Sequence, residues 1–221
     1  MSRLLDQQIQ KLKLNFITMG LNVSTALSDA VDAWLNNDLT LAQTVIDGDE
    51  KINEQETHLE GKSAQIIALQ QPVAGDLRKI VAILKASSDL ERLADHAIHI
   101  AKKARREQKA PSDSELTDLL LKMAENDKQM LTDILQAYSD LDDDAAVKIS
   151  EKDHQTDEYL QQVNQIIIQR IKEQPDFALE AMDYMKLGNH FERIGDYVTN
   201  IAEWIVYTER GRITELGNSD Y

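Results

Sequence analysis

A segment repeated 101 residues apart constrains the fold of this chain more than any other feature. Residues 89–101 read DLERLADHAIHIA, and residues 190–202 read HFERIGDYVTNIA. Five of the 13 aligned positions are identical, and they include the pattern Glu-Arg-x-x-Asp. A long internal repeat indicates a chain built from similar structural units that pack on one another. We therefore predict two tandem halves, residues 1–110 and residues 111–221.

Turn-forming residues are scarce, which excludes a fold of many short strands. The 221 residues include only 8 Gly and 3 Pro, whereas a sandwich or barrel needs a turn about every 10 residues. Apolar residues recur instead at helical spacing, for example at Leu77, Ile80 and Leu84. Proline is excluded from helix interiors, so each proline marks a junction. The three prolines are Pro72, Pro111 and Pro175.

The prolines, together with polar breaks at residues 36–38 and 140–144, divide the chain into six helices. Asp and Asn at the polar breaks are expected to cap the helices that follow them. Each helix of about 30 residues has a length of ~45 Å, which suits a bundle. The predicted fold class is all-α, with two tandem three-helix bundles. The six helices are expected near residues 4–36, 38–70, 73–107, 113–140, 142–174 and 176–210.

Composition excludes several classes of function. The absence of Cys rules out zinc–thiolate sites, iron–sulfur clusters and a Cys nucleophile. With 39 acidic and 24 basic residues, the net charge of −15 argues against nucleic-acid binding. No apolar run approaches the ~20 residues of a membrane span and no signal peptide is visible, so we expect a cytoplasmic protein without membrane insertion. A solvated basic helix end is expected at Lys102, Lys103, Arg105, Arg106 and Lys109.

The repeated acids are the candidate functional residues. At about 100° per residue, Asp95 lies about 40° from Glu91 and near Leu84, inside the apolar stripe of its helix. A carboxylate in a helix-packing surface needs a counter-charge. Acids at positions i and i+4 lie one above the other, and a matching pair on the next helix makes an all-oxygen metal site. The candidate ligands are Glu91, Asp95, Asp49 and Asn53 in the first half, and Glu192, Asp196, Asp153 and Asp157 in the second.

Three interpretations of these acids stay open from the residues alone. In the first, Glu91 and Glu192 form structural ion pairs with Arg or Lys of a neighbouring helix, such as Arg78. The second is the metal site. The third is general acid–base catalysis, but no nucleophile, pocket glycine or lone catalytic His accompanies the acids. We therefore predict no catalytic residues, and the lack of a phosphate-binding glycine motif predicts no nucleotide cofactor.

The histidines have metal-like spacing without matching partners. Glu151-x-x-His154 has the spacing of a di-iron carboxylate motif, but that architecture needs the motif twice. His96 and His99 lie about one turn apart, well away from the carboxylate face of their helix. We expect all three histidines to be exposed.

The chain resembles the PhoU family. The resemblance rests on tandem three-helix halves that each carry E-R-[LI]-[AG]-D in the last helix, at residues 91–95 and 192–196. It extends over residues 10–210, nearly the whole chain. Further similarities are Met19-Gly20, Ile46-Asp47-Gly48-Asp49, Gln71-Pro72 followed by Asp76-Leu77-Arg78, and Asn200-Ile201-Ala202-Glu203.

This resemblance implies a regulator rather than an enzyme. PhoU proteins are cytoplasmic, often homodimeric, negative regulators of the phosphate-starvation response and of phosphate uptake. They are adaptors between the ATP-binding subunit of the phosphate ABC transporter and the PAS domain of a sensor histidine kinase. Some members bind iron or other metals through [ED]-x-x-x-D motifs, which implies iron, Zn, Mn, Mg or no metal at the eight residues above. Asn53 is a neutral and weaker ligand, so the first site is expected to be the poorer one.

Two other functions stay open. One is a PhoU-like bundle that regulates a low-affinity phosphate permease. The other is a carboxylate-bridged metalloenzyme, which would need the second Glu-x-x-His motif that this sequence lacks.

Overall fold

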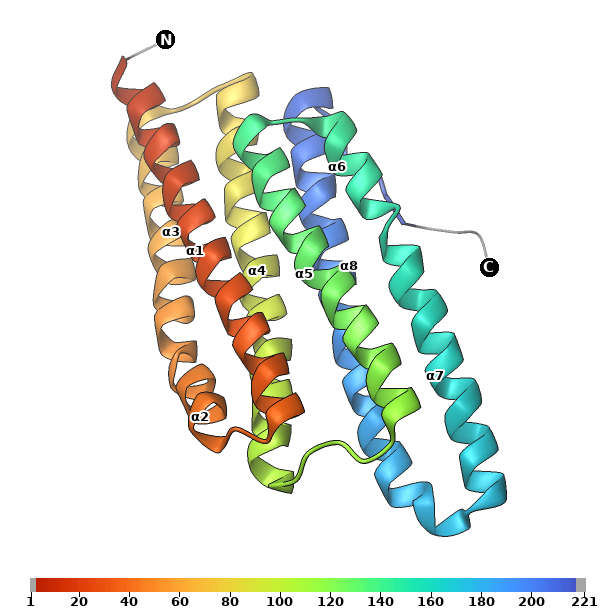
Figure 1. Ribbon diagram of the computed structural model, residues 1–221. Helices are drawn as coiled ribbons and strands as arrows, with labels where there is room; N and C mark the ends of the chain where they lie inside the picture. Colours follow the sequence, from red (N-terminus) through yellow and green to blue (C-terminus); the bar gives the residue numbers. More distant parts are fainter. Residues whose placement is uncertain (1–2, 218–221) are drawn as a thin grey trace.

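Long α-helices joined by short loops make up the chain (Figure 1). The structure is a computed structural model that describes residues 3–217, and no strand occurs within that range. The predicted all-α class is confirmed. The helices are α1 (Arg3–Asn36), α2 (Leu39–Asp47), α3 (Asp49–Gln70), α4 (Ala74–Glu107), α5 (Ser114–Asp140), α6 (Asp143–Ser150), α7 (Asp153–Glu173) and α8 (Ala178–Arg210), with a 3-10 turn, η1 (Pro175–Phe177), before α8.

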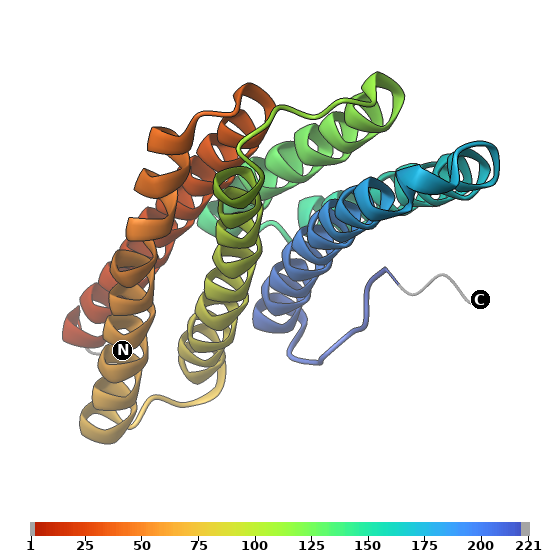
Figure 2. The same cartoon turned by 90° about the horizontal axis from the view of Figure 1, so that it is seen from below.

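Two three-helix bundles lie side by side (Figures 1 and 2). The first consists of α1, the α2–α3 pair and α4, and the second of α5, the α6–α7 pair and α8. Two helix pairs, α4 with α8 and α1 with α5, pack along a seam between the bundles. The tandem arrangement is therefore confirmed, and the boundary between residues 110 and 111 stays a prediction.

The middle helix of each half is divided into two helices. The predicted single helices at 38–70 and 142–174 are α2 with α3 and α6 with α7 in the structure. The interruptions fall at Gly48 and at Glu151–Lys152, where the backbone stays in the right-handed helical region. The chain bends there without a loop, so no run of turn residues marks the place. The break matters for the site because α3 begins at Asp49 and α7 begins at Asp153, each with its carboxylate in a first helical turn.

The polar breaks in the sequence do cap helices, as predicted. The carboxylate of Asp38 accepts hydrogen bonds from the backbone N–H groups of Thr40 and Leu41 at the start of α2. Asp142 accepts one from the Ala145 N–H at the start of α6. Such caps supply partners for N–H groups that a helix leaves unsatisfied at its first turn.

Apolar side chains of both bundles form one continuous core. The helix α4 is buried on several sides because it packs against α1, α3 and α8. Its positions Leu93, Ala94, Ala97, Ile98 and Ile100 are all buried. The apolar surface of α4 is therefore wider than a single stripe, which changes where its acids lie.

The basic end of α4 is only partly solvated. Lys103 is buried, its ammonium bonds to Glu107, and the same group lies 3.5 Å from Asp183 of α8. Arg106 also lies 3.4 Å from Asp183. The expectation of a fully solvated cluster was wrong for Lys103, because α8 packs against this end of α4 and supplies the half-buried carboxylate of Asp183.

The linker that contains Pro111 is fixed to α8 by one hydroxyl group. The backbone N–H groups of Ser112 and Asp113 donate hydrogen bonds to the Tyr184 hydroxyl oxygen, at 3.0 and 2.9 Å. Tyr184 is buried, and Asp113 then caps α5. One side chain thus orders the connection between the two halves.

Replacing Tyr184 with Phe is expected to lower the free energy of unfolding by about 1–2 kcal/mol, because two backbone donors lose their acceptor. Denaturant unfolding monitored by circular dichroism measures this change. Tyr207→Phe is the matched control, since that ring packs against Trp204 and its hydroxyl makes no hydrogen bond among the described residues. Equal effects of the two changes would contradict the assigned role of Tyr184.

Across residues 3–217, no helix combines the length and the apolar character that a membrane span requires.

Candidate functional site

The four acids predicted in the second half come together between α7 and α8. Asp153 begins α7 and Asp157 lies one turn further on, while Glu192 and Asp196 face them from α8. Burial raises the pKa of Asp153 to about 7, and the charges of Asp157, Asp196 and Glu192 add to the effect. Burial likewise raises the pKa of Glu192 and of Asp196. The cluster therefore holds negative charge at a free-energy cost that a cation or a proton would relieve.

Asp127 of α5 is a fifth member that the sequence analysis did not identify. It is fully buried, and its Oδ1 accepts a hydrogen bond of 3.1 Å from the Thr156 hydroxyl. Its Oδ2 and the Oδ1 of Asp153 are buried and have no hydrogen-bond partner within the described residues. Burial is the main reason that the pKa of Asp127 lies well above its usual value, and the charges of Asp153 and Glu192 raise it further.

The position of Asp127 in the sequence could have identified it as a candidate buried acid. It occupies a position in the apolar stripe of α5, three residues after Ala124 and four before Leu131, both of which are buried. A lone acid at an apolar position of a helix is a candidate for a buried charge. Its partner Asp153 is 26 residues away in sequence, so only the fold shows that the two meet.

Gly195 makes the space in which Asp153 lies. A Cβ atom built on Gly195 would lie 2.1 Å from Asp153 Oδ1 and 3.6 Å from Asp127 Oδ1. Both buried carboxylates therefore approach the same point on the α8 backbone. At the aligned position of the repeat, the first half carries Ala94.

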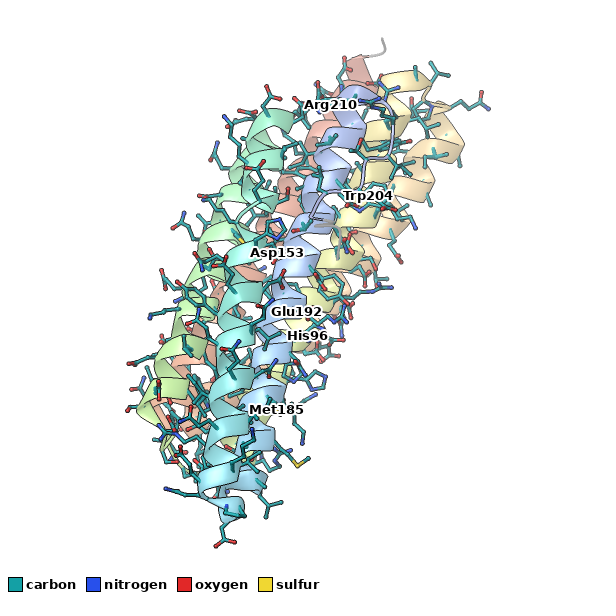
Figure 3. All side chains as sticks on the ribbon, turned by 90° about the vertical axis from the view of Figure 1, so that its right-hand side faces the viewer. His96, Asp153, Met185, Glu192, Trp204 and Arg210 are labelled. Carbon is teal, nitrogen blue, oxygen red and sulfur yellow. The ribbon has the colours of Figure 1, made fainter. Side chains whose placement is uncertain are left out.

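The acid cluster of the second half opens to solvent through a groove of about 500 Å³. Asp153, Asp196 and Thr199 line one side, and the C-terminal segment lines the other with Leu216 and Gly217. Figure 3 shows Asp153 and Glu192 on the face where α7 and α8 lie together. A small cation can therefore reach the acids without any rearrangement of the helices.

The acids Glu192 and Asp196 form ion pairs with a basic residue of the same helix, α8. Arg193 lies 3.0 Å from Asp196 and 3.5 Å from Glu192, and it is more than half exposed. Arg78, the candidate partner from a neighbouring helix, instead donates to the backbone carbonyl of Thr208. Arg78 is therefore not the inter-helix partner that the ion-pair interpretation offered as one candidate. An exposed pair such as that of Arg193 contributes little to stability.

The first half holds a looser cluster. Burial raises the pKa of Glu91 to about 7, with Asp95, Glu56 and Asp49 as the next contributors. Asn53 is exposed, as is Asp95. The structure thus brings Glu91, Asp95 and Asp49 together and adds Glu56, a residue absent from the predicted set.

The candidate ligands of α4, Glu91 and Asp95, lie at the edge of its apolar surface rather than within it. Glu91 is half-buried and Asp95 is exposed, while Ala94 and Ala97 are buried. The prediction placed the stripe on residues such as Leu84, which is itself only half-buried. Packing of α1 and α8 against α4 moves the centre of burial away from the acids.

The second-half cluster fits a hard cation by its chemistry. Its donors are carboxylate oxygens, which suit Mg²⁺, Mn²⁺ or iron, and two of these oxygens are buried without a partner. As the side chains stand, no three His, Asp or Glu residues among residues 3–217 are arranged to hold one ion. Binding at the eight predicted residues therefore stays a prediction, and it requires side-chain rotation.

The histidines differ from expectation at one position. Glu151 and His154 are exposed as predicted, and so is His99. His96 is half-buried, however, and its Nδ1 lies 2.9 Å from Nδ1 of His190 on α8. The expectation that His96 is exposed was wrong because α8 packs against that side of α4. Burial lowers the pKa of His190 to about 4 and also lowers that of His96.

The fold and the acid clusters define a class, an all-helical protein made of two tandem three-helix bundles with a carboxylate cluster in each. The sequence matches the PhoU domain twice, over residues 16–104 and 120–205. The chain belongs to the PhoU family.

Relatives with similar lengths support this membership. The phosphate-specific transport system accessory protein PhoU homolog of Streptococcus pneumoniae serotype 4 is 33% identical over 96% of this chain and 97% of its own. The PhoU accessory protein of Escherichia coli K12 is 31% identical over 94% and 86%. The crystal structure of the phosphate transport system regulatory protein PhoU from Streptococcus pneumoniae has a TM-score of 0.88 at 32% identity, covering 96% of this chain and all of that one. The expectation that the chain is not an enzyme is confirmed, because the family consists of accessory and regulatory proteins.

Proposed function

We propose that this protein is a cytoplasmic negative regulator of the phosphate-starvation response and of phosphate uptake. It acts as an adaptor between the ATP-binding subunit of a phosphate ABC transporter and the PAS domain of a sensor histidine kinase. The observation that carries the proposal is similarity over nearly the full length to a protein named as a phosphate-specific transport system accessory protein. The broad helical faces and the net charge of −15 favour a role in protein recognition, with a partner surface that is locally basic.

Deletion of the gene is expected to raise expression of phosphate-scavenging genes in high phosphate, and a plasmid copy is expected to restore repression. Transcript measurement tests this directly, and unchanged expression in the deletion strain would contradict the regulatory role. Crosslinking in cells then identifies the partners. Crosslinks to a low-affinity permease instead of the ABC transporter and the kinase would overturn the adaptor proposal. Light scattering of the purified chain tests the proposed homodimer.

A divalent cation is proposed to bind the carboxylate clusters, more tightly in the second half. The double change Glu192→Gln with Asp196→Asn is expected to remove more metal than the matched change Glu91→Gln with Asp95→Asn. The physical reason is that Asp153 and Asp127 contribute buried, unpartnered oxygens to the second cluster, whereas Asn53 and Asp95 of the first are exposed. Elemental analysis of protein purified without chelator gives the measurement. Metal-free wild-type protein would reject a constitutive metal site.

A further inference from the structure

Three of the five histidines gather between α4 and α8, beside Asp95 of the first acid cluster. His96 and His99 project from α4, and His190 projects from α8. Figure 3 shows His96 beside α8, on the same face as Glu192. We infer that His96, His99 and His190 form a binding site for a divalent transition metal of the zinc, nickel or copper type. This site is separate from the proposed regulatory function and does not depend on it.

Two ring nitrogens of this cluster lie close together. Nδ1 of His96 and Nδ1 of His190 lie 2.9 Å apart. Two imidazole nitrogens bound to one tetrahedral Zn²⁺ at about 2.0–2.1 Å lie roughly 3.3 Å from each other. The two nitrogens are therefore about 0.4 Å closer than in a chelate. Both rings must also turn, because in the hydrogen-bonded pair each nitrogen points at the other rather than at a shared metal.

The spacing of the three rings also bears on metal binding. Imidazoles that share one tetrahedral metal have ring centroids about 5.2 Å apart, from the same bond length. The centroid of His190 is 5.2 Å from that of His96 and 5.2 Å from that of His99. The centroids of His96 and His99 are 6.4 Å apart. Two of the three centroid separations thus match a three-histidine site, but the ring of His99 is stacked on that of His190 and must turn before both can bind one metal.

His99 is the side chain that has to rotate to complete the three-histidine site. His99 is exposed, and its ring is stacked on that of His190 with an angle of 12° between their planes. Rotation about its side-chain bonds turns a nitrogen towards the His96–His190 pair. Because His99 faces solvent, the fourth coordination position is left to water, as in other three-histidine sites.

The nature of the donors selects the metal. Imidazole nitrogen suits Zn²⁺, Cu²⁺ and Ni²⁺, whereas Mg²⁺ and Ca²⁺ prefer oxygen. The other groups that face the cluster are Asp95, which favours a cation, Arg193, which opposes one, and the ring of Tyr197 at 5.7 Å from His96. The histidine site and the carboxylate clusters are therefore expected to take different metals.

Metal binding here would join the two halves of the molecule. The ligands lie on α4 and α8, the pair of helices that packs along the seam. A metal that binds only the folded chain raises its stability in proportion to the logarithm of metal concentration. The site would thus fix the two bundles to each other.

The test uses the full chain after removal of metals with a chelator. Titration with Cu²⁺ is expected to give nitrogen hyperfine structure in the electron paramagnetic resonance spectrum, which carboxylate binding does not produce. Zn²⁺ is expected to compete for the same site and to raise the melting temperature by several degrees. His190→Gln is expected to simplify the nitrogen hyperfine structure, because one coupled nitrogen is lost, and to weaken Zn²⁺ binding at least tenfold. His96→Gln is expected to do the same.

Matched controls are available on the same chain. His58 and His154 are exposed, so His58→Gln and His154→Gln are expected to leave the signal and the Zn²⁺ affinity unchanged. His99→Gln tests the third ligand, and an affinity equal to that of the wild type would overturn the three-histidine site. A wild-type spectrum without nitrogen hyperfine structure, or one that His190→Gln does not alter, would also overturn it. The double change Glu192→Gln with Asp196→Asn is expected to leave this signal in place.

Discussion

In protein freed of metal, replacing Asp127 with Asn is expected to raise the free energy of unfolding by about 2–3 kcal/mol at pH 8. Asp127 is fully buried, its one described hydrogen bond comes from Thr156, and its Oδ2 has no partner among the described residues. A neutral amide removes the cost of a buried negative charge. It also places a donor near the orphaned oxygen of Asp153.

The same residues set the pH dependence of stability. The pKa values of Asp127, Asp153 and Glu91 are raised in the folded state, to about 7 for the last two. Between pH 4 and 7 the folded state therefore binds protons that the unfolded state has already lost. Stability decreases as pH rises through this window, because the derivative follows the difference in bound protons. The metal-free wild type is thus expected to be more stable at pH 5.5 than at pH 8.

Urea unfolding at pH 5.5 and pH 8 measures both effects. The gain from Asp127→Asn is expected to be smaller at pH 5.5 than at pH 8, because burial raises the pKa of the wild-type carboxyl and lower pH favours its neutral form. Asp118→Asn is the matched control, since Asp118 is exposed on the same helix. A gain of equal size at both pH values would show that charge is not its cause.

Gly195→Ala is expected to destabilise the protein by about 1–3 kcal/mol, through overpacking. The new methyl group would lie 2.1 Å from Asp153 Oδ1 and 3.2 Å from its Cγ. Asp153 would have to leave the position from which it faces Asp127 and Thr199. The change is therefore expected also to lower metal binding in the second half.

Gly61→Ala is the matched control, and it is expected to stabilise the protein where Gly195→Ala destabilises it. Gly61 lies in α3 with no atom within 4 Å of an added Cβ, so the substitution is expected to stabilise by up to about 1 kcal/mol through helix propensity. Thermal unfolding of both variants gives the comparison. Stabilisation by Gly195→Ala of the same size as by Gly61→Ala would show that Asp153 does not occupy the space beside α8.

The helices were predictable because their signals are local. Apolar spacing, prolines and capping residues fix where a helix begins and ends, and Asp38 and Asp142 act as the caps that the sequence predicted. The bends at Gly48 and Glu151 were not predictable, since the backbone there keeps helical angles. Propensity alone does not detect a bend of this kind.

The candidate site was predictable only where the repeat showed it. Duplication made Glu192 and Asp196 visible as a recurring pair, and the fold brings them to Asp153 and Asp157. Asp127 has no such repeat, and His190 aligns with Asp89, so neither was identified. Side chains from different helices meet through tertiary packing, which the pattern along one helix does not encode.

The seam between the bundles shows what fusing two copies in one chain permits. Trp204 donates a hydrogen bond to Asp89 across the seam. By the offset of 101 residues, the symmetric counterpart of this contact would join His190 to Lys103. Lys103 instead bonds to Glu107, and His190 contacts His96. In a symmetric pair of separate subunits every contact occurs twice, whereas in a single chain each seam position can differ from its counterpart in the other half.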